Sequence, residues 1–110
     1  AQTWSMISAG AGKTRRVIIA FADSPYTVPD GVGFVGVNDA GGACTVVLPA
    51  LVATGLVARE IQVAKLTSNA NIVTVDGNAA ELILDAATFP LPNAFSAARF
   101  VDAATLWSVL

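Results

Sequence analysis

Short apolar runs, each ended by residues that favour turns, most constrain what this chain can fold into. Runs rich in Val and Ile recur along the sequence, and clusters of Gly, Pro, Asn and Asp separate them. The breaks come about every 8–12 residues, which leaves room for strands but little room for helices of ordinary length. The pattern predicts an all-β fold, a compact β-sandwich or barrel of about eight short strands.

The strands can be placed from the apolar runs and the turns between them. A short extended stretch is expected at residues 26–28, and Pro90 and Pro92 mark a longer connection. The expected strands are residues 16–22, 32–37, 44–48, 57–66, 72–75, 81–85, 97–101 and 105–110, and the last two form a hairpin. A helix over residues 51–66 is an alternative for that stretch, but Gly55 and its β-branched residues disfavour it.

The N-terminal segment differs from the rest of the chain. Residues 1–14 are mostly small and polar, so we expect an extended arm ahead of a single β domain at residues 15–110. A solvated segment without a partner is the plainer interpretation; an arm that docks on a neighbouring protein is the sharper one. Its candidate contact residues are the bulky apolar side chains and the basic cluster: Trp4, Met6, Ile7, Lys13, Arg15 and Arg16.

The chain has few charges for its apolar content. In 110 residues, 55% are hydrophobic and 13% charged, and the mean hydropathy is +0.66. A domain this small leaves much of its surface in water, so apolar surface would remain exposed on a lone copy. A membrane or a partner subunit would cover such a surface.

A partner subunit is a better explanation than a membrane for what covers the apolar surface. The longest uncharged stretch, residues 40–58, is interrupted by Gly41, Gly42, Pro49 and Gly55, so it predicts two strands rather than a membrane helix. We therefore expect no membrane partner and a symmetric oligomer. The candidate subunit interface consists of one face of the strand at 57–66 and the last aromatic residue: Arg59, Ile61, Val63 and Trp107.

The sequence lacks the residues that most catalytic and metal-binding sites require. The sequence has no His and one Cys, so histidine catalysis, disulfides and Cys-cluster zinc sites are not expected. The net charge of −2 argues against nucleic acid as a partner. Cys44 lies in an apolar run without a neighbouring base, so we expect a buried structural thiol. The Asp residues lie mostly in or beside turns, where such side chains bond the local backbone.

One motif invites a nucleotide-binding interpretation. Gly10-Ala11-Gly12-Lys13-Thr14 is similar to the end of a phosphate-binding loop, but Ile7 occupies the position of the first Gly, and a strand follows in place of a helix. We expect no cofactor, no metal and no enzymatic activity. A carboxylate-dependent hydrolase has no positive support in the sequence.

The order of motifs from Gly31 to Leu110 resembles a module of small bacteriophage virion proteins: trimeric capsid decoration proteins, head fibres and tail-fibre segments. Where members of this family tend to have Asp-Gly-Thr before the final Trp, this chain has Asp102-Ala103-Ala104-Thr105. The resemblance is carried by Asn38-Asp39-Ala40-Gly41-Gly42, Thr45-Val46-Val47-Leu48-Pro49, Gly55, Arg59-Glu60-Ile61-Gln62-Val63, Asn71-Ile72-Val73-Thr74-Val75-Asp76-Gly77 and Thr105-Leu106-Trp107-Ser108-Val109.

The resemblance implies a homotrimer with a structural role in the virion and no catalytic residues. We expect a capsid decoration (cement) protein that binds the major capsid protein on the outer capsid surface and stabilises the shell. A tail-fibre or tail-tip module that binds a host receptor is one alternative. A carbohydrate-binding module that uses Trp107 or the Phe side chains is another.

Overall fold

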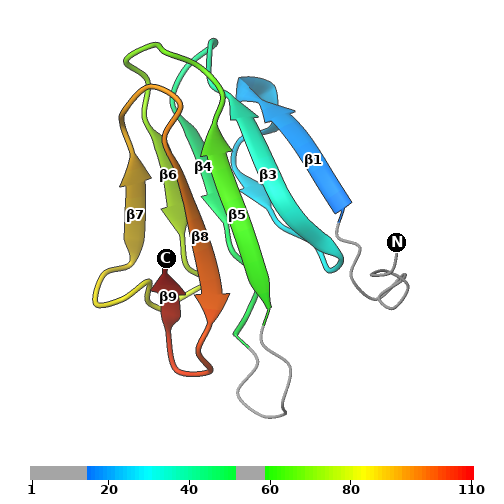
Figure 1. The fold of residues 1–110 in the computed structure, drawn as a ribbon, viewed down its shortest axis with the longest axis vertical. Helices are drawn as coiled ribbons and strands as arrows, with labels where there is room; N and C mark the ends of the chain where they lie inside the picture. Colours follow the sequence, from blue (N-terminus) through cyan, green and yellow to red (C-terminus); the bar gives the residue numbers. More distant parts are fainter. Residues whose placement is uncertain (1–14, 52–58) are drawn as a thin grey trace, which may run out of the picture.

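The computed structural model describes residues 15–51 and 59–110, and these form two β-sheets packed face to face (Figure 1). One sheet has five strands in the order β1-β3-β5-β8-β9, and the other has four in the order β2-β4-β6-β7. The strands are β1 (Arg15–Ala20), β2 (Tyr26–Thr27), β3 (Val32–Asn38), β4 (Cys44–Val47), β5 (Glu60–Lys65), β6 (Val73–Asp76), β7 (Thr88–Leu91), β8 (Ala97–Asp102) and β9 (Trp107–Val109). A short 3-10 helix, η3 (Phe21–Asp23), follows β1.

The chain alternates between the two sheets like a coil. β1, β3 and β5 pair in parallel in the five-stranded sheet, and β2, β4 and β6 pair in parallel in the four-stranded sheet. Three turns of this coil are followed by β7, β8 and β9, which add antiparallel strands to the two sheets. The all-β, sandwich-like architecture expected from the sequence is therefore confirmed.

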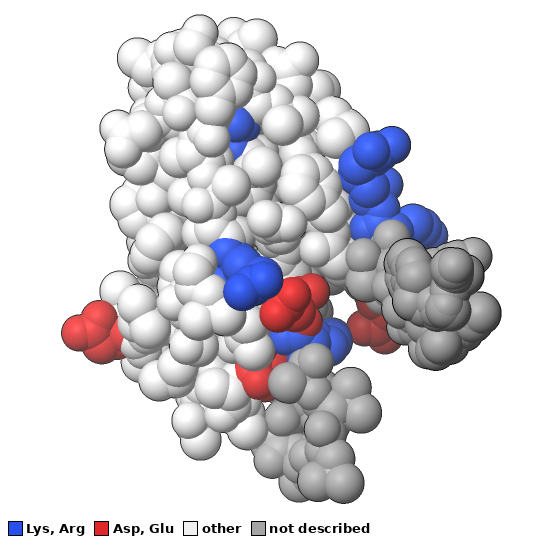
Figure 2. All heavy atoms as spheres, viewed as in Figure 1, with Lys and Arg blue, Asp and Glu red and all other residues white. Residues whose placement is uncertain are grey.

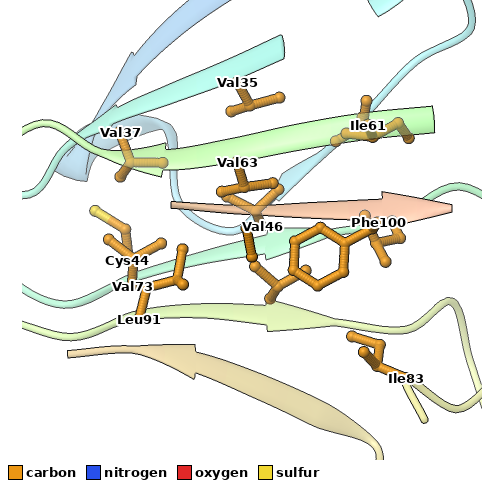
Figure 3. Close-up of a cluster of buried hydrophobic side chains, with 14 of the residues drawn as sticks. Val35, Val37, Cys44, Val46, Ile61, Val63, Val73, Ile83, Leu91 and Phe100 are labelled. Carbon is orange, nitrogen blue, oxygen red and sulfur yellow. The ribbon is translucent and has the colours of Figure 1, made fainter. Parts of the chain in front are cut away.

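The core lies between the sheets and consists mainly of β-branched side chains. Alternate residues of each strand point inward, so Val35 and Val37 of β3 face Val46 of β4 across the interior (Figure 3). Phe100 of β8 meets Phe89 of β7 edge to face, with 5.7 Å between the ring centres. Branched and aromatic residues fill a sandwich core with little loss of side-chain freedom, which accounts for the many short Val-rich runs.

Two expected elements between β6 and β8 differ in the structure. Residues 81–85 form turns in which Ile83 makes only isolated bridges, to Ala86 and Trp107. The strand lies instead at Thr88–Leu91, where a connection was expected. Pro90 is tolerated there because β7 is the edge strand of its sheet, so the missing N–H does not interrupt a central ladder.

The other predictions meet the structure as follows. The hairpin at the C-terminus is confirmed as the β8–β9 pair, and the helix alternative is wrong where the chain is described, because Glu60–Lys65 is strand. Residues 52–58 and the arm at 1–14 lie outside the described residues. Within the described ranges, no helix is long and apolar enough to cross a membrane.

Candidate interaction surface

Three of the four residues expected at a subunit interface are inside the chain's own core. Ile61, Val63 and Trp107 are 2%, 0% and 0% exposed. The alternation along β5 placed Ile61 and Val63 on one face as expected, but that face points into the sandwich. These three side chains therefore offer no surface to a second copy, and Trp107 has no free ring face on which a sugar could stack.

Arg59, the fourth expected interface residue, is engaged within the chain. Its guanidinium donates to the Asp30 carboxylate at 3.2 Å and to the backbone oxygen of Ala50. Nearby, the backbone N–H of Leu51 donates to the Glu81 carboxylate at 3.0 Å. These contacts fix the chain on both sides of residues 52–58, which gives Arg59 a structural role in this part of the fold.

Only two of the expected arm contacts fall within the described residues. Arg15 and Arg16 begin β1 and are exposed, at the end of the sandwich from which β1 starts (Figure 1). Trp4, Met6, Ile7 and Lys13 lie outside the described residues.

Four of the eight exposed large apolar side chains in the described part of the chain lie on connections at the opposite end of the sandwich, at the top of Figure 1. There β1, β3 and β5 end and β8 begins, so four connections meet: residues 21–25, 39–43, 66–72 and 92–96. We call this end the loop end, and its large apolar side chains are Phe21 (50% exposed), Leu66 (40%), Ile72 (42%) and Phe95 (66%).

Local features of the sequence keep two of these side chains at the surface. The Phe21 ring lies against Gly42, where an added Cβ would come within 2.8 Å of the ring. Leu66 meets Ile18 above Gly36, where an added Cβ would come within 2.7 Å of Ile18 Cδ1. Glycine therefore leaves the space that these apolar side chains occupy outside the core.

Backbone hydrogen bonds fix the positions of the other two residues, Phe95 and Ile72. The N–H of Phe95 donates to the oxygen of Thr67 at 3.1 Å, and Phe95 itself has a φ of 53°. The oxygen of Ile72 accepts from the N–H of Cys44 at 3.2 Å. The connection at 92–96 is thus fastened to the one at 66–72, which in turn is fastened to the start of β4.

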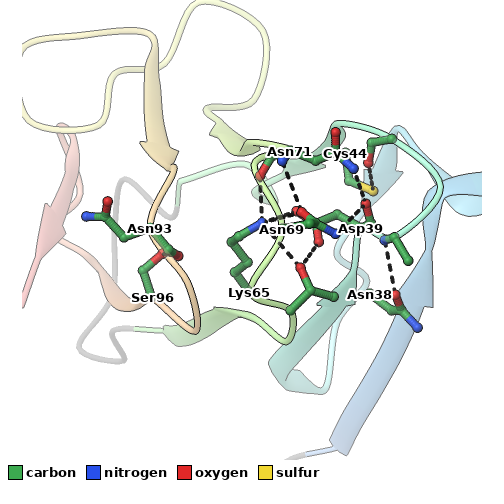
Figure 4. A network of polar contacts seen from close by, with 11 residues as sticks. Asn38, Asp39, Cys44, Lys65, Asn69, Asn71, Asn93 and Ser96 are labelled. Carbon is green, nitrogen blue, oxygen red and sulfur yellow. Dashed lines mark hydrogen bonds and ion pairs between the residues drawn. The ribbon is translucent and has the colours of Figure 1, made fainter.

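A buried polar network supports the loop end from below (Figure 4). Lys65 at the end of β5 and Asp39 after β3 are fully buried, with 2.5 Å between Nζ and Oδ2. The Lys65 ammonium also donates to Asn69 Oδ1 at 2.9 Å and to the Asn71 backbone oxygen at 2.6 Å. Thr67 donates its hydroxyl to the other oxygen of Asp39. Every polar partner in the network belongs to the two connections after β3 and β5 or to the end of β5.

The electrostatics keep this network ionic. Burial raises the pKa of Asp39, but the hydrogen bonds from Lys65 and Thr67 and the charge of Lys65 outweigh it, so the net pKa lies below the ordinary value. Burial, followed by the nearby charge of Asp39, raises the pKa of the Cys44 thiol. Cys44 is therefore a protonated, buried thiol without the activation that a nucleophile needs.

Charged side chains are scarce at the loop end. Among its four connections, Asp23 is the one exposed charged residue, because Asp39 is buried. In the view of Figure 2 the top of the molecule is almost uncoloured, and the charged groups gather lower down. One exposed ion pair there joins Arg99 of β8 to Glu60 of β5, at 3.7 Å.

The loop end was not found by reasoning from sequence, although a signal for it existed. Phe95 lies in the stretch Pro92-Asn93-Ala94-Phe95-Ser96, which is otherwise made of small and turn residues, so a large apolar side chain there has no strand to bury it. Phe21 gave no such signal, because it belongs to the apolar run at 16–22 that was expected to be strand. Lys65 shares a strand face with Ile61 and Val63, and a cation on a buried face requires a buried partner.

The loop end can bind by apolar contact, and it carries no cluster of reactive groups. Among residues 15–51 and 59–110, no group of His, Cys, Asp or Glu side chains could hold a metal ion. Neither the protein-family models nor the curated proteins give a match to this chain.

Proposed function

We propose that the protein is a bacteriophage capsid decoration protein, a homotrimer that binds the major capsid protein on the outer surface of the shell and stabilises it. The observation that carries the proposal is the loop end, which groups exposed large apolar side chains with a single exposed charge. A solitary soluble domain rarely groups such side chains, whereas a protein with an assembly role presents them to a partner.

Two further features support a structural role. The motifs at residues 31–110 resemble those of small virion proteins, and the compact sandwich presents its apolar groups on short connections fastened by hydrogen bonds. Trimer formation would cover part of the apolar surface that the low charge content of 13% leaves in water.

A tail-fibre or tail-tip module is the second candidate, and the coil geometry favours it. β1 and β2 are both edge strands, and both belong to the first turn of the coil. Further turns of β structure can stack on such an edge, as in solenoid proteins. In that case the virion role remains, but the location is the tail.

Capsid binding tests the proposal directly. Native mass spectrometry of the purified protein is expected to show three copies, and sedimentation is expected to show the protein on capsids assembled without it. Antibody labelling of complete particles then distinguishes shell from tail. A monomer that does not bind the capsids would overturn the proposal, and label confined to the tail would favour the second candidate.

A further inference from the structure

We propose that the loop end faces the shell, and that its partner is a preformed, uncharged apolar patch on the major capsid protein. The inference rests on the proposed function and names the partner surface for it. The side chains that would make the contact are Phe21, Leu66, Ile72 and Phe95.

Charge decides the class of partner. The four connections expose no cation, and Asp23 is their one exposed anion. A nucleic acid or an anionic lipid surface needs basic side chains, which this end of the described chain lacks. An apolar protein surface needs none.

Rigidity decides how the contact forms. Lys65 and Asp39 fasten the connection at 39–43 to the one at 66–72, and the side-chain amide of Asn71 donates to the backbone oxygen of Asp39 at 2.6 Å. Phe95 is joined to the same group through Thr67. A surface that is already ordered loses little conformational entropy on binding, so it suits a partner whose surface is also ordered, such as an assembled shell.

The direction of β1 separates this contact from the N-terminal segment. β1 runs from Arg15 toward the loop end, so Arg15 and Arg16 lie at the end of the strand away from Phe21 (Figure 1). Contacts made by the basic cluster and by the loop end are therefore distinct, and either can be removed without touching the other.

Two double variants of matched exposure test the inference. Phe95→Ser with Ile72→Ser changes side chains that are 66% and 42% exposed at the loop end. Leu110→Ser with Leu82→Ser changes side chains that are 67% and 41% exposed, beyond β9 and between β6 and β7, away from the loop end. Both pairs remove similar apolar exposure, so only position distinguishes them.

We expect the loop-end pair to weaken binding to capsids by about 10-fold or more, while the control pair binds like the unchanged protein. Both variants should keep the subunit number in native mass spectrometry and the same urea unfolding curve. Equal capsid binding by the two variants would overturn the inference. A change of subunit number in the loop-end pair would also overturn it, because this end would then be a subunit interface.

A separate measurement addresses the lipid alternative. The unchanged protein is mixed with uncharged phosphatidylcholine vesicles, and we expect no co-sedimentation. Binding to the vesicles that the loop-end pair loses would assign the surface to a membrane and overturn the inference. Failure of the unchanged protein to bind capsids would instead contradict the proposed function, so the two failures are distinguishable.

Discussion

Among single side chains, Lys65 gives the sharpest test of the network under the loop end. Lys65→Met removes the cation and leaves the Asp39 carboxylate buried, with hydrogen bonds from the uncharged side chains of Thr67 and Asn69 but no positive charge beside it. An uncompensated buried charge is strongly destabilising, so we expect the free energy of unfolding to fall by about 3–5 kcal/mol. Urea unfolding followed by Trp fluorescence measures the change, because Trp107 is in the core.

Arg99→Met is the matched control for that variant. Arg99 also belongs to an ion pair with a carboxylate, but the two side chains are 48% and 55% exposed and the atoms are 3.7 Å apart. Solvent screens such a pair, so its loss is expected to change the free energy of unfolding by less than about 1 kcal/mol. Similar effects of the two variants would show that burial of Lys65 and Asp39 does not decide the stability of the network.

For the connections between strands, Gly77 after β6 should be less tolerant of a side chain than Gly36 within β3. A Cβ at Gly77 would lie 2.2 Å from the backbone oxygen of Glu81, whereas at Gly36 it would meet only the ends of the Ile18 and Leu66 side chains. Side-chain ends can move, and backbone cannot without disturbing the turn. We expect Gly77→Ala to lower the free energy of unfolding by about 1–3 kcal/mol and Gly36→Ala by less.

The urea midpoints of the two glycine variants check this order. A larger loss for Gly36→Ala would mean that the turn between β6 and β7 accommodates a side chain by shifting, and that the close approach at Glu81 does not constrain the fold.

The strands were predictable where a Val-rich run is half buried, because alternation of side chains is a local property. β3, β4 and β6 follow from it, and so does the β8–β9 hairpin. β7 was missed because Pro90 is acceptable only on an edge, and the edge position depends on the order of strands in the sheet. The parallel coil was not predictable either, because a Val-rich strand has the same pattern in both directions.

The candidate surface was harder to predict than the strands. Ile61 and Val63 were correctly placed on one face, but the sequence does not say whether that face meets the second sheet or a second subunit. Phe21 and Phe95 become a common surface only because connections far apart in the sequence end at one side of the sandwich. That convergence is a property of the tertiary fold.

For the molecule as a whole, the proposed homotrimer predicts a dependence of thermal stability on concentration. If three copies bury part of each other's apolar surface, dissociation accompanies unfolding, and the Tm rises with protein concentration by mass action. Calorimetry over about a hundredfold range of concentration measures this. The variant with Phe95→Ser and Ile72→Ser should show the same dependence, because the loop end is assigned to the shell and not to the other subunits. A Tm that is constant over the range would contradict the trimer, and a dependence lost only in this variant would move the subunit interface to the loop end.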